Sequence, residues 1–428
     1  MVEGVKFELG GIMAPLLPEN DPITQSFQIA NHIFPGAWRY MMPAELSALS
    51  LPAERQSTCM NCPKTCTEQY RPDYRCCTYH PRIPNFLLGL ALASGKKQEL
   101  APILKGSAMI TPEGLHESPA QWYAYLADTK DEQFGKSKHV LCPLLDTKNG
   151  LCRVHAFRNS VCSTFFCLKD HGVKSEKFWE QLLALGTQVE TLLSQWALRQ
   201  LGFDLDAYMA RLNAYEDRVE TLSLPGNRGW SKAALKMLWG DWYGRELELY
   251  EQTARLISEH RDSLWDIANN VSITDAARFE TALIASVPEH LKEEIDAQDL
   301  DDNDDLESVA YKPHELWQKL YKAHQSLNSI QYGFYRLNRR VILGPNAKKD
   351  AEESYHAAKP WFVGIRAGNS GWNFRLFLSQ EEKNLIESFQ TAASIDFNTI
   401  ARFKGAGHKN ARAFILEAVH RRILIKQK

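Results

Sequence analysis

Apolar residues recur every three or four positions over much of the chain after residue 172, as they do along helices that bury one face. The first such series is Phe178, Leu182, Leu185, Val189, Leu192 and Trp196. A second long helix is predicted from Ser231 to Asn269, and a shorter one near Ala276–Ile284. Closer to the N-terminus, the apolar runs Pro84–Leu92 and Gln121–Leu126 are also expected to be helical.

The pattern changes near the C-terminus. A helix is expected over His314–Arg340, and two aromatic runs at 361–366 and 372–378 then read as strands, joined by a Gly-containing turn into a β-hairpin at 361–378. Ser379 followed by Glu382 is a capping box, which predicts the start of another helix. The expected fold class is mainly α with a small β-hairpin.

The 428 residues exceed the usual size of one domain, so more than one is expected. The sequence divides into an irregular Pro- and Gly-containing segment, a cysteine-cluster module, a helical region, an acidic linker and a C-terminal helical region with the hairpin. Their ranges are 1–58, 59–172, 173–295, 296–310 and 311–428. The acidic run around the linker favours a solvated connection, because a calcium loop needs ordered spacing and a turn glycine that this run lacks.

Net charge and hydropathy exclude several classes of protein. A formal charge of −2 gives no overall attraction to nucleic acid or to an anionic membrane. No apolar run reaches the roughly 18 residues needed to cross a bilayer, and the first thirty residues lack the basic start and apolar stretch of a signal peptide. We therefore expect a cytoplasmic protein without a membrane partner. Its nine cysteines are then not expected to form structural disulfides.

All nine cysteines lie between residues 59 and 167. The first group has a two-residue spacer between Cys59 and Cys62, a spacing that recurs in zinc and iron–sulfur sites because a tight turn brings both thiolates to one ion. Adjacent Cys76 and Cys77 cannot easily fill two corners of one tetrahedron. This predicts two metal sites, or one site and a spare thiol.

The order of these motifs resembles the bacterial YkgJ-like cysteine-cluster family, whose members are described as zinc- or iron-chelating. The resemblance covers residues 59–167, including Cys142-Pro-Leu-Leu and Gly150-Leu-Cys152. It departs from the family pattern at His155, Asn159, Ser163 and Phe166. The metal ligands that it implies are Cys59, Cys62, Cys76, Cys77, Cys142, Cys152, Cys162 and Cys167, with Cys66 as the additional cysteine. The implied cofactor is zinc or iron, with an iron–sulfur cluster as one form of the iron site.

Other residues near the cysteines leave alternatives open. His80 and His155 each follow a cysteine by three residues and are candidate nitrogen ligands. Cys66 is also a candidate nucleophilic or redox thiol. A similar cysteine arrangement in flagellin lysine methylases makes an iron-dependent or iron–sulfur redox or protein-modifying enzyme the alternative to a metal-binding module. The sequence leaves open whether the site is catalytic.

The C-terminal residues are basic. From Ala401 to Lys428 there are eight Lys or Arg residues and one acid, Glu417. Such a patch could bind an acidic protein or nucleic acid, which is the second alternative function. The favoured interpretation is a solvated terminal helix whose apolar side is Phe414, Ile415, Val419 and Ile423. No Walker loop, dinucleotide fingerprint, His-Glu-x-x-His motif or nucleophile elbow is present in the sequence.

Overall fold

The computed structural model describes the residues 17, 20–29, 32–49, 70–130, 133–165, 173–213, 223–224, 228–271, 311–327, 333–345, 359–367, 371–395, 400 and 411–427. The predicted helix at Ala276–Ile284 and the acidic linker at 296–310 lie outside these residues, as do Cys59, Cys62, Cys66 and Cys167.

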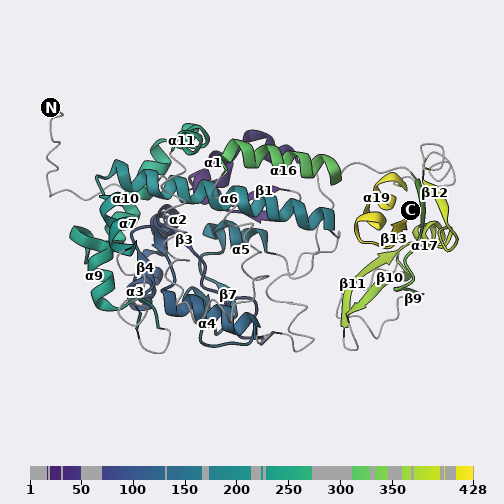
Figure 1. The fold of residues 1–428 in the computed structure, drawn as a ribbon, viewed down its shortest axis with the longest axis horizontal. Coiled ribbons are helices and arrows are strands. Elements are labelled where there is room, and N and C mark those ends of the chain that lie inside the picture. The colour runs from purple at the N-terminus through teal and green to yellow at the C-terminus, as the bar shows by residue number, and fades with distance from the viewer. Residues whose placement is uncertain are drawn as a thin grey trace.

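The fold is mainly α, with several small antiparallel sheets, which confirms the expected class (Figure 1). The α-helices are α1 (Trp38–Met41), α2 (Asn85–Ala91), α3 (Lys97–Ser107), α4 (Pro119–Lys130), α5 (Ser160–Thr164), α6 (Val173–Gln200), α7 (Leu205–Asn213), α9 (Lys232–Trp239), α10 (Glu246–Glu259), α11 (Leu264–Asn270), α16 (Pro313–Leu327), α17 (Gln380–Glu387) and α19 (Ala411–His420). Short 3-10 turns are η1 (Pro22–Thr24), η2 (Ala44–Ala48), η5 (His155–Phe157), η6 (Gly240–Trp242) and η7 (Arg261–Ser263), and α2 continues into a π-helical segment, η4 (Leu92–Lys96).

The strands are short and pair with antiparallel neighbours. They are β1 (Phe27–Ile29), β2 (His32–Phe34), β3 (Ile83–Pro84), β4 (Ile110–Thr111), β5 (Gly114–Leu115), β6 (Leu145–Asp146), β7 (Leu151–Cys152), β8 (Gly333–Leu337), β9 (Val341–Pro345), β10 (Trp361–Ala367), β11 (Gly371–Leu378), β12 (Ala393–Ile395) and β13 (Leu424–Lys426). The sheet orders are β1-β2, β3-β5-β4, β6-β7, β11-β10-β9 and β12-β8-β13.

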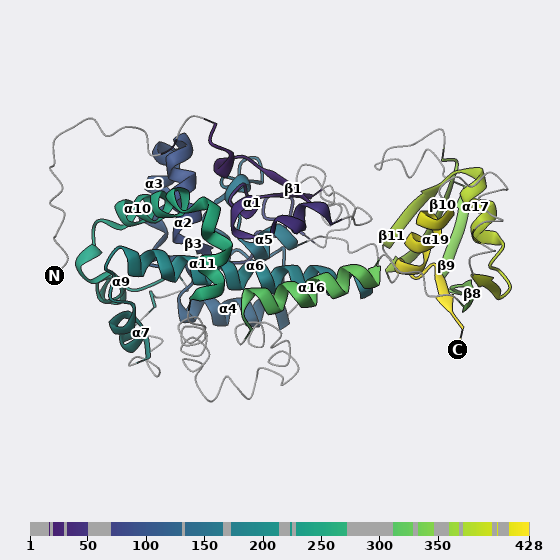
Figure 2. The same cartoon turned by 90° about the horizontal axis from the view of Figure 1, so that it is seen from above.

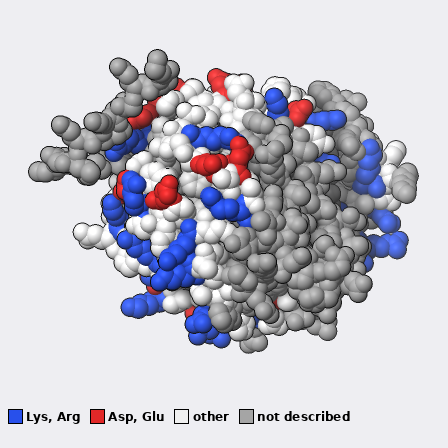
Figure 3. All heavy atoms as spheres, turned by 60° about the vertical axis from the view of Figure 1, so that its left-hand side comes forward, with Lys and Arg blue, Asp and Glu red and all other residues white. Residues whose placement is uncertain are grey.

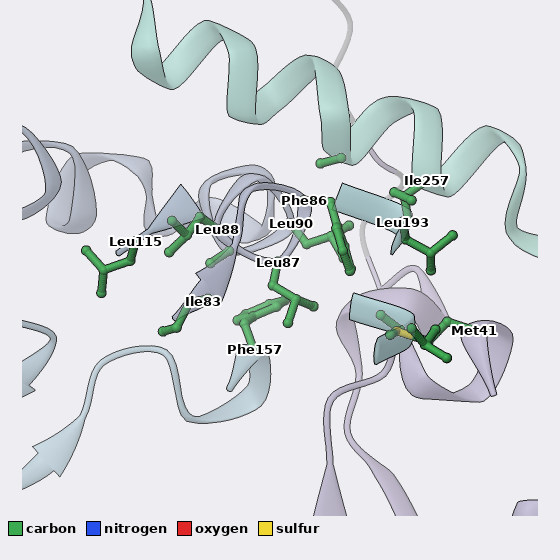
Figure 4. Close-up of a cluster of buried hydrophobic side chains, with 14 of the residues drawn as sticks. Met41, Ile83, Phe86, Leu87, Leu88, Leu90, Leu115, Phe157, Leu193 and Ile257 are labelled. Carbon is green, nitrogen blue, oxygen red and sulfur yellow. The ribbon is translucent and has the colours of Figure 1, made fainter. Parts of the chain in front are cut away.

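Helix α2 lies at the centre of the larger core, and every one of its residues is buried (Figure 4). Phe86, Leu87 and Leu90 extend from it toward other elements of this core, and burying each such side chain contributes about 1.5–3 kcal/mol. Gly89 allows α10 to pass close by, since a Cβ atom there would lie 1.9 Å from the carbonyl oxygen of Tyr250. A helix buried on all sides explains the uninterrupted apolar run in the sequence.

Helix α6 is the predicted amphipathic helix. Phe178, Leu182, Leu185 and Val189 lie in the same core, Leu192 is buried, and partly buried Trp196 packs against this core. Helix α16 packs along α6, as Figure 2 shows, with Leu316 and Leu320 buried. The prediction of one helix over His314–Arg340 is wrong, because α16 ends at Leu327 and Gly333 begins strand β8. Phe334 is exposed, whereas Tyr335 and Leu337 pack in or against the smaller core, which is the two-residue period of a strand.

The predicted helix from Ser231 to Asn269 is also wrong as a single element. The structure divides it into α9, α10 and α11, with 3-10 turns between them. The first break contains Gly240 and Gly244, both with positive φ, 51° and 90°. A residue with positive φ ends helical hydrogen bonding. The helix therefore stops there, although the apolar spacing in the sequence continues.

The segment before the cysteine module is more ordered than an irregular lead-in where it is described. It forms the β1–β2 hairpin and helix α1, and Trp38 is completely buried. The side-chain N–H of Trp38 donates to an oxygen of Glu190 at 3.3 Å, which joins this segment to α6.

A second, smaller core forms from residues between Tyr335 and Leu424, at the opposite end of the molecule from α9 (Figure 1). The β10–β11 hairpin at 361–378 is confirmed, with Trp361 opposite Leu378, and the Ser379–Glu382 capping box is confirmed. The expected terminal helix is only partly correct. Phe414, Ile415 and Ile423 are buried and Val419 partly so, but the chain leaves α19 at His420 and continues into strand β13.

Charge on the surface is mixed in sign. Figure 3 shows Lys and Arg interspersed with Asp and Glu on the face that turns forward from the side of α9 and α10 in Figure 1. Ion pairs among the described residues include that of Lys97 with Glu251 at 2.6 Å. Among the helices of the described residues, none combines the length and the apolar character that a bilayer crossing requires.

Candidate metal centre

Five of the predicted ligands are described: Cys76, Cys77, Cys142, Cys152 and Cys162, and all five are thiols. They come from three segments, which are the turn after residue 70, the β6–β7 region and helix α5. The other predicted cysteines, Cys59, Cys62, Cys66 and Cys167, lie outside the described residues.

The β6–β7 ribbon holds Cys142 and Cys152 at its base. Cys152 is opposite Leu145, and the amide of Arg153 donates to the carbonyl of Leu144 at 3.0 Å. The ribbon turns through Gly150, whose φ of +66° is in the left-handed region that favours glycine. The Asp146 side chain accepts the amide N–H of Lys148 at 3.1 Å and closes this turn.

The segment with Cys76 and Cys77 is hydrogen-bonded to the ribbon on both sides. The Arg75 guanidinium donates to the carbonyl oxygens of Gly150 and Asn149. The amide of Cys142 donates to the carbonyl of Cys77 at 2.8 Å. A Cβ on Gly150 would lie 2.6 Å from the Arg75 guanidinium carbon, so another residue there would require this guanidinium to shift. The segment with Cys76 and Cys77 therefore adjoins the ribbon that carries Cys142 and Cys152.

Cys162 lies in the short helix α5. The side chain of Asn159 caps this helix by accepting the amide N–H of Cys162 at 3.0 Å. Glu190 of α6 accepts the amide and hydroxyl of Ser160, at 3.0 and 2.9 Å. Burial raises the pKa of Glu190 to about 7, and the donors Ser160 and Trp38 act in the opposite direction. This carboxyl group attaches α5, and thus Cys162, to the long helix.

The thiols affect one another electrostatically. Burial raises the pKa of Cys162 far above its usual value, and Cys152 and Cys76 raise it further. Burial likewise raises the pKa of Cys142, followed by Cys152 and Cys162, while the amide groups of Leu144 and Leu145 lower it. Amide donors beside a sulfur stabilise a thiolate, as they do around metal-bound cysteines. Cys76, Cys142, Cys152 and Cys162 thus form one group, which we call the thiol cluster.

The two candidate histidines differ in their surroundings. His80 is buried, and burial lowers its pKa, while Glu117 and the backbone of Leu141 act the other way. Partial burial, together with the charge of Arg158, lowers the pKa of His155 to about 4 although this residue is exposed. Both rings are therefore biased toward the neutral form, which is the form that binds metals.

A buried polar group beside the thiols was not identified from the sequence. Glu117, 2% exposed, pairs with Arg82 at 2.9 Å. Burial would raise the pKa of Glu117, but Arg82 and His116 bring it below its usual value. Burial raises the pKa of Tyr79, and the charge of Glu117 and, to a smaller extent, Cys162 raise it further. The sequence does contain a helix-capping pattern next to Glu117, in which Ser118 is followed by Gln121. In the structure the amide of Ser118 donates to the side chain of Gln121 at 2.9 Å, at the start of α4.

The donor set suits a soft metal ion, because thiolates bind zinc and iron strongly and a bound cation displaces the protons of the thiols. Within the part of the chain that the structure describes, however, no three His, Cys, Asp or Glu side chains are close enough to hold an ion. The thiol cluster is therefore an incomplete ligand set by itself.

No protein-family model, curated protein or solved structure matches this chain. The resemblance to the cysteine-cluster family thus depends on the residues and spacings given above.

Proposed function

We propose that this protein binds zinc or iron, with an iron–sulfur cluster as one form of the iron site, through its clustered cysteines. The observation that supports this most directly is the thiol cluster, in which four cysteines from three segments lie within electrostatic range of one another. The same four cysteines are among the eight that the family resemblance implies as ligands.

Physical chemistry favours a cation at such a place. Burial and the neighbouring thiols raise the pKa values of Cys142 and Cys162, so loss of a proton from either one is unfavourable without a positive charge nearby. A bound divalent ion would displace the protons from the sulfurs and offset the resulting negative charges. The amide groups near Cys142 would then donate to its thiolate, which is the usual environment of a ligating cysteine.

The proposed ligand set extends beyond the described residues. The coordination that the thiol cluster begins would be completed by Cys59, Cys62 and Cys167. Further candidate ligands are Cys66, His80 and His155. Of the adjacent pair, Cys76 raises the pKa of Cys162, so we assign Cys76 to the thiol cluster. Cys77 would serve a second ion or remain a spare thiol.

Elemental analysis and a visible absorption spectrum of protein purified without oxygen test this function. Stoichiometric zinc in a colourless sample supports a structural module, and stoichiometric iron with charge-transfer absorption supports an iron or iron–sulfur site. Folded protein that contains neither metal, and that takes up neither on addition, would contradict the proposal.

The second candidate is an iron-dependent or iron–sulfur enzyme of the redox or protein-modifying kind. The observation in its favour is the buried polar group at His80, Arg82 and Glu117, because perturbed ionisable residues beside a metal are common in active sites. An enzyme of this kind needs a redox-active or open metal position. Reversible bleaching by dithionite, or a spectral shift on adding a small exogenous ligand, would support it over a closed structural site.

A further inference from the structure

The β12-β8-β13 sheet of the smaller core has one face turned outward. Side chains along its central strand β8 alternate, so that Tyr335 is 2% exposed and Phe334 is 61% exposed. The register places Phe334 opposite Ser394 of β12 and Arg336 opposite Ile425 of β13. Ile425, 38% exposed, therefore shares the outer face with Phe334 and Arg336. This outer face exposes an aromatic ring beside an arginine.

Arg336 has an unused donor on this face. Its Nε atom is shielded from solvent and has no hydrogen-bond partner among the described residues. Arg336 as a whole is partly exposed, so its guanidinium brings positive charge to this face without an internal acceptor at Nε.

Three further arginines gather at one end of the same sheet. Arg339 and Arg340 follow β8, and Arg422 precedes β13, and all three are exposed. The Asn338 side chain connects them, since it donates to the carbonyl of Arg422 at 3.0 Å and accepts the amide of Arg340 at 3.0 Å. None of the three forms an ion pair within the described residues. By contrast, Arg421 is buried and paired with Glu417 at 2.9 Å.

We infer that the outer face of the β12-β8-β13 sheet binds single-stranded nucleic acid, with a base stacked on Phe334 and phosphates bound by Arg336, Arg339, Arg340 and Arg422. An exposed aromatic ring on a central strand offers a stacking surface to any base, and exposed arginines match the charge of the backbone. Strand β8, from Gly333 to Leu337, extends about 16 Å, enough for a few nucleotides. This function would be separate from metal binding, because its residues lie on or next to the β12-β8-β13 sheet, whose Tyr335 and Leu424 pack in the smaller core, whereas Cys142 packs in the larger core.

A single strand fits these features better than the other anionic partners. A duplex keeps its bases stacked internally and would leave the Phe334 ring unused. An acidic peptide would pair with the arginines but gains little from an aromatic ring flanked by Ser394. The arginines and the ring thus point to a ligand that carries both phosphates and exposed flat bases.

Fluorescence anisotropy of a labelled 12-nucleotide oligo-dT or oligo-U with the full chain, at low and moderate salt, tests the proposal. We expect Phe334→Ala to weaken binding about tenfold with an unchanged thermal midpoint, because this side chain is largely exposed. Arg340→Gln should weaken binding and reduce the slope of log K against log salt by about 0.7, the value for one phosphate of a single strand. Ile342→Ala and Lys232→Gln are matched exposed controls and should have no effect.

Three results would overturn the inference. One is the absence of binding to either oligonucleotide at low salt. Another is an equal loss of affinity in the Phe334→Ala variant and in the two controls. The third is tighter retention on vesicles containing phosphatidylserine than on the oligonucleotide, with the same dependence on Phe334, which would assign the face to a membrane surface.

Discussion

The amide of Cys142 donates a hydrogen bond of 2.8 Å to the carbonyl oxygen of Cys77, and this bond joins two cysteine groups that are distant in the sequence. It fixes the backbone of both residues before any ion binds. The Arg75 side chain adds a second connection on the other side of the turn. The backbone around the thiol cluster is therefore held by hydrogen bonds that do not involve the sulfur atoms.

Substitution of single cysteines should separate ligands from the additional thiol. Cys152→Ser and Cys59→Ser should each lower the metal content of the purified protein, because each removes a proposed ligand. Cys66→Ser should change it less. Elemental analysis beside circular dichroism measures the loss and checks the fold. Equal losses from all three variants would contradict the assignment of Cys66 as the additional cysteine.

Metal affinity should rise with pH. Because burial and the neighbouring thiols raise the pKa values of Cys142 and Cys162, each sulfur must release a proton when it binds an ion near neutral pH. Competition titrations with a chromophoric chelator between pH 6 and pH 8 should give a log K that increases by at least about one per pH unit. The Cys152→Ser variant should have a shallower dependence, and an affinity independent of pH would exclude binding through these thiols.

Glu190 should make the folded chain less stable as pH rises. Its folded pKa of about 7 lies above the ordinary value of 4.5, so the folded chain holds more protons than the unfolded chain between these two values. The contribution to the free energy of unfolding is present below pH 4.5 and is lost as pH rises to 7, by roughly 3 kcal/mol. Urea denaturation at pH 5 and pH 8 measures it. Glu190→Gln should remove most of this difference, and an unchanged difference would show that the group does not titrate as described.

Gly150→Ala should destabilise the chain more than Gly95→Ala. Both glycines have positive φ, +66° and +84°, and a left-handed alanine costs about 1–2 kcal/mol in either place. At Gly95 a Cβ atom meets nothing within 4 Å, whereas at Gly150 it would press against Arg75. We therefore expect about 1 kcal/mol more loss at Gly150, together with a lower metal content in that variant only. Equal effects in chemical denaturation would mean that Arg75 moves aside freely.

Local patterns in the sequence predicted the elements that depend on local interactions. The series along α6, the capping box at Ser379 and the hairpin at 361–378 all follow from neighbouring residues, and all are present. The errors arose where apolar spacing persists through a change of direction. Gly240 and Gly244 turn the chain between α9 and α10, and Gly333 begins a strand after α16, yet neither position interrupts the apolar residues.

The candidate site was predicted only in part for a related reason. Cysteine spacing indicated which residues are candidate ligands. It could not show that Cys76 lies within electrostatic range of Cys162, because this depends on how the turn at Arg75 and helix α5 are placed. The burial of Glu117 next to Arg82 also depends on tertiary packing. Sequence periodicity describes one face of one element, whereas such groups form where several elements meet.

The packing of α16 along α6 has a consequence for the order in which this protein is made. Ribosomes synthesise residues 173–200 of α6 long before residues 313–327 of α16. The apolar side of α6 that α16 covers is therefore uncovered by α16 until residues 313–327 have been synthesised. Exposed surface of that kind attracts chaperones and promotes aggregation. Expression of fragments that stop before residue 313 should therefore yield less soluble protein than expression through residue 327.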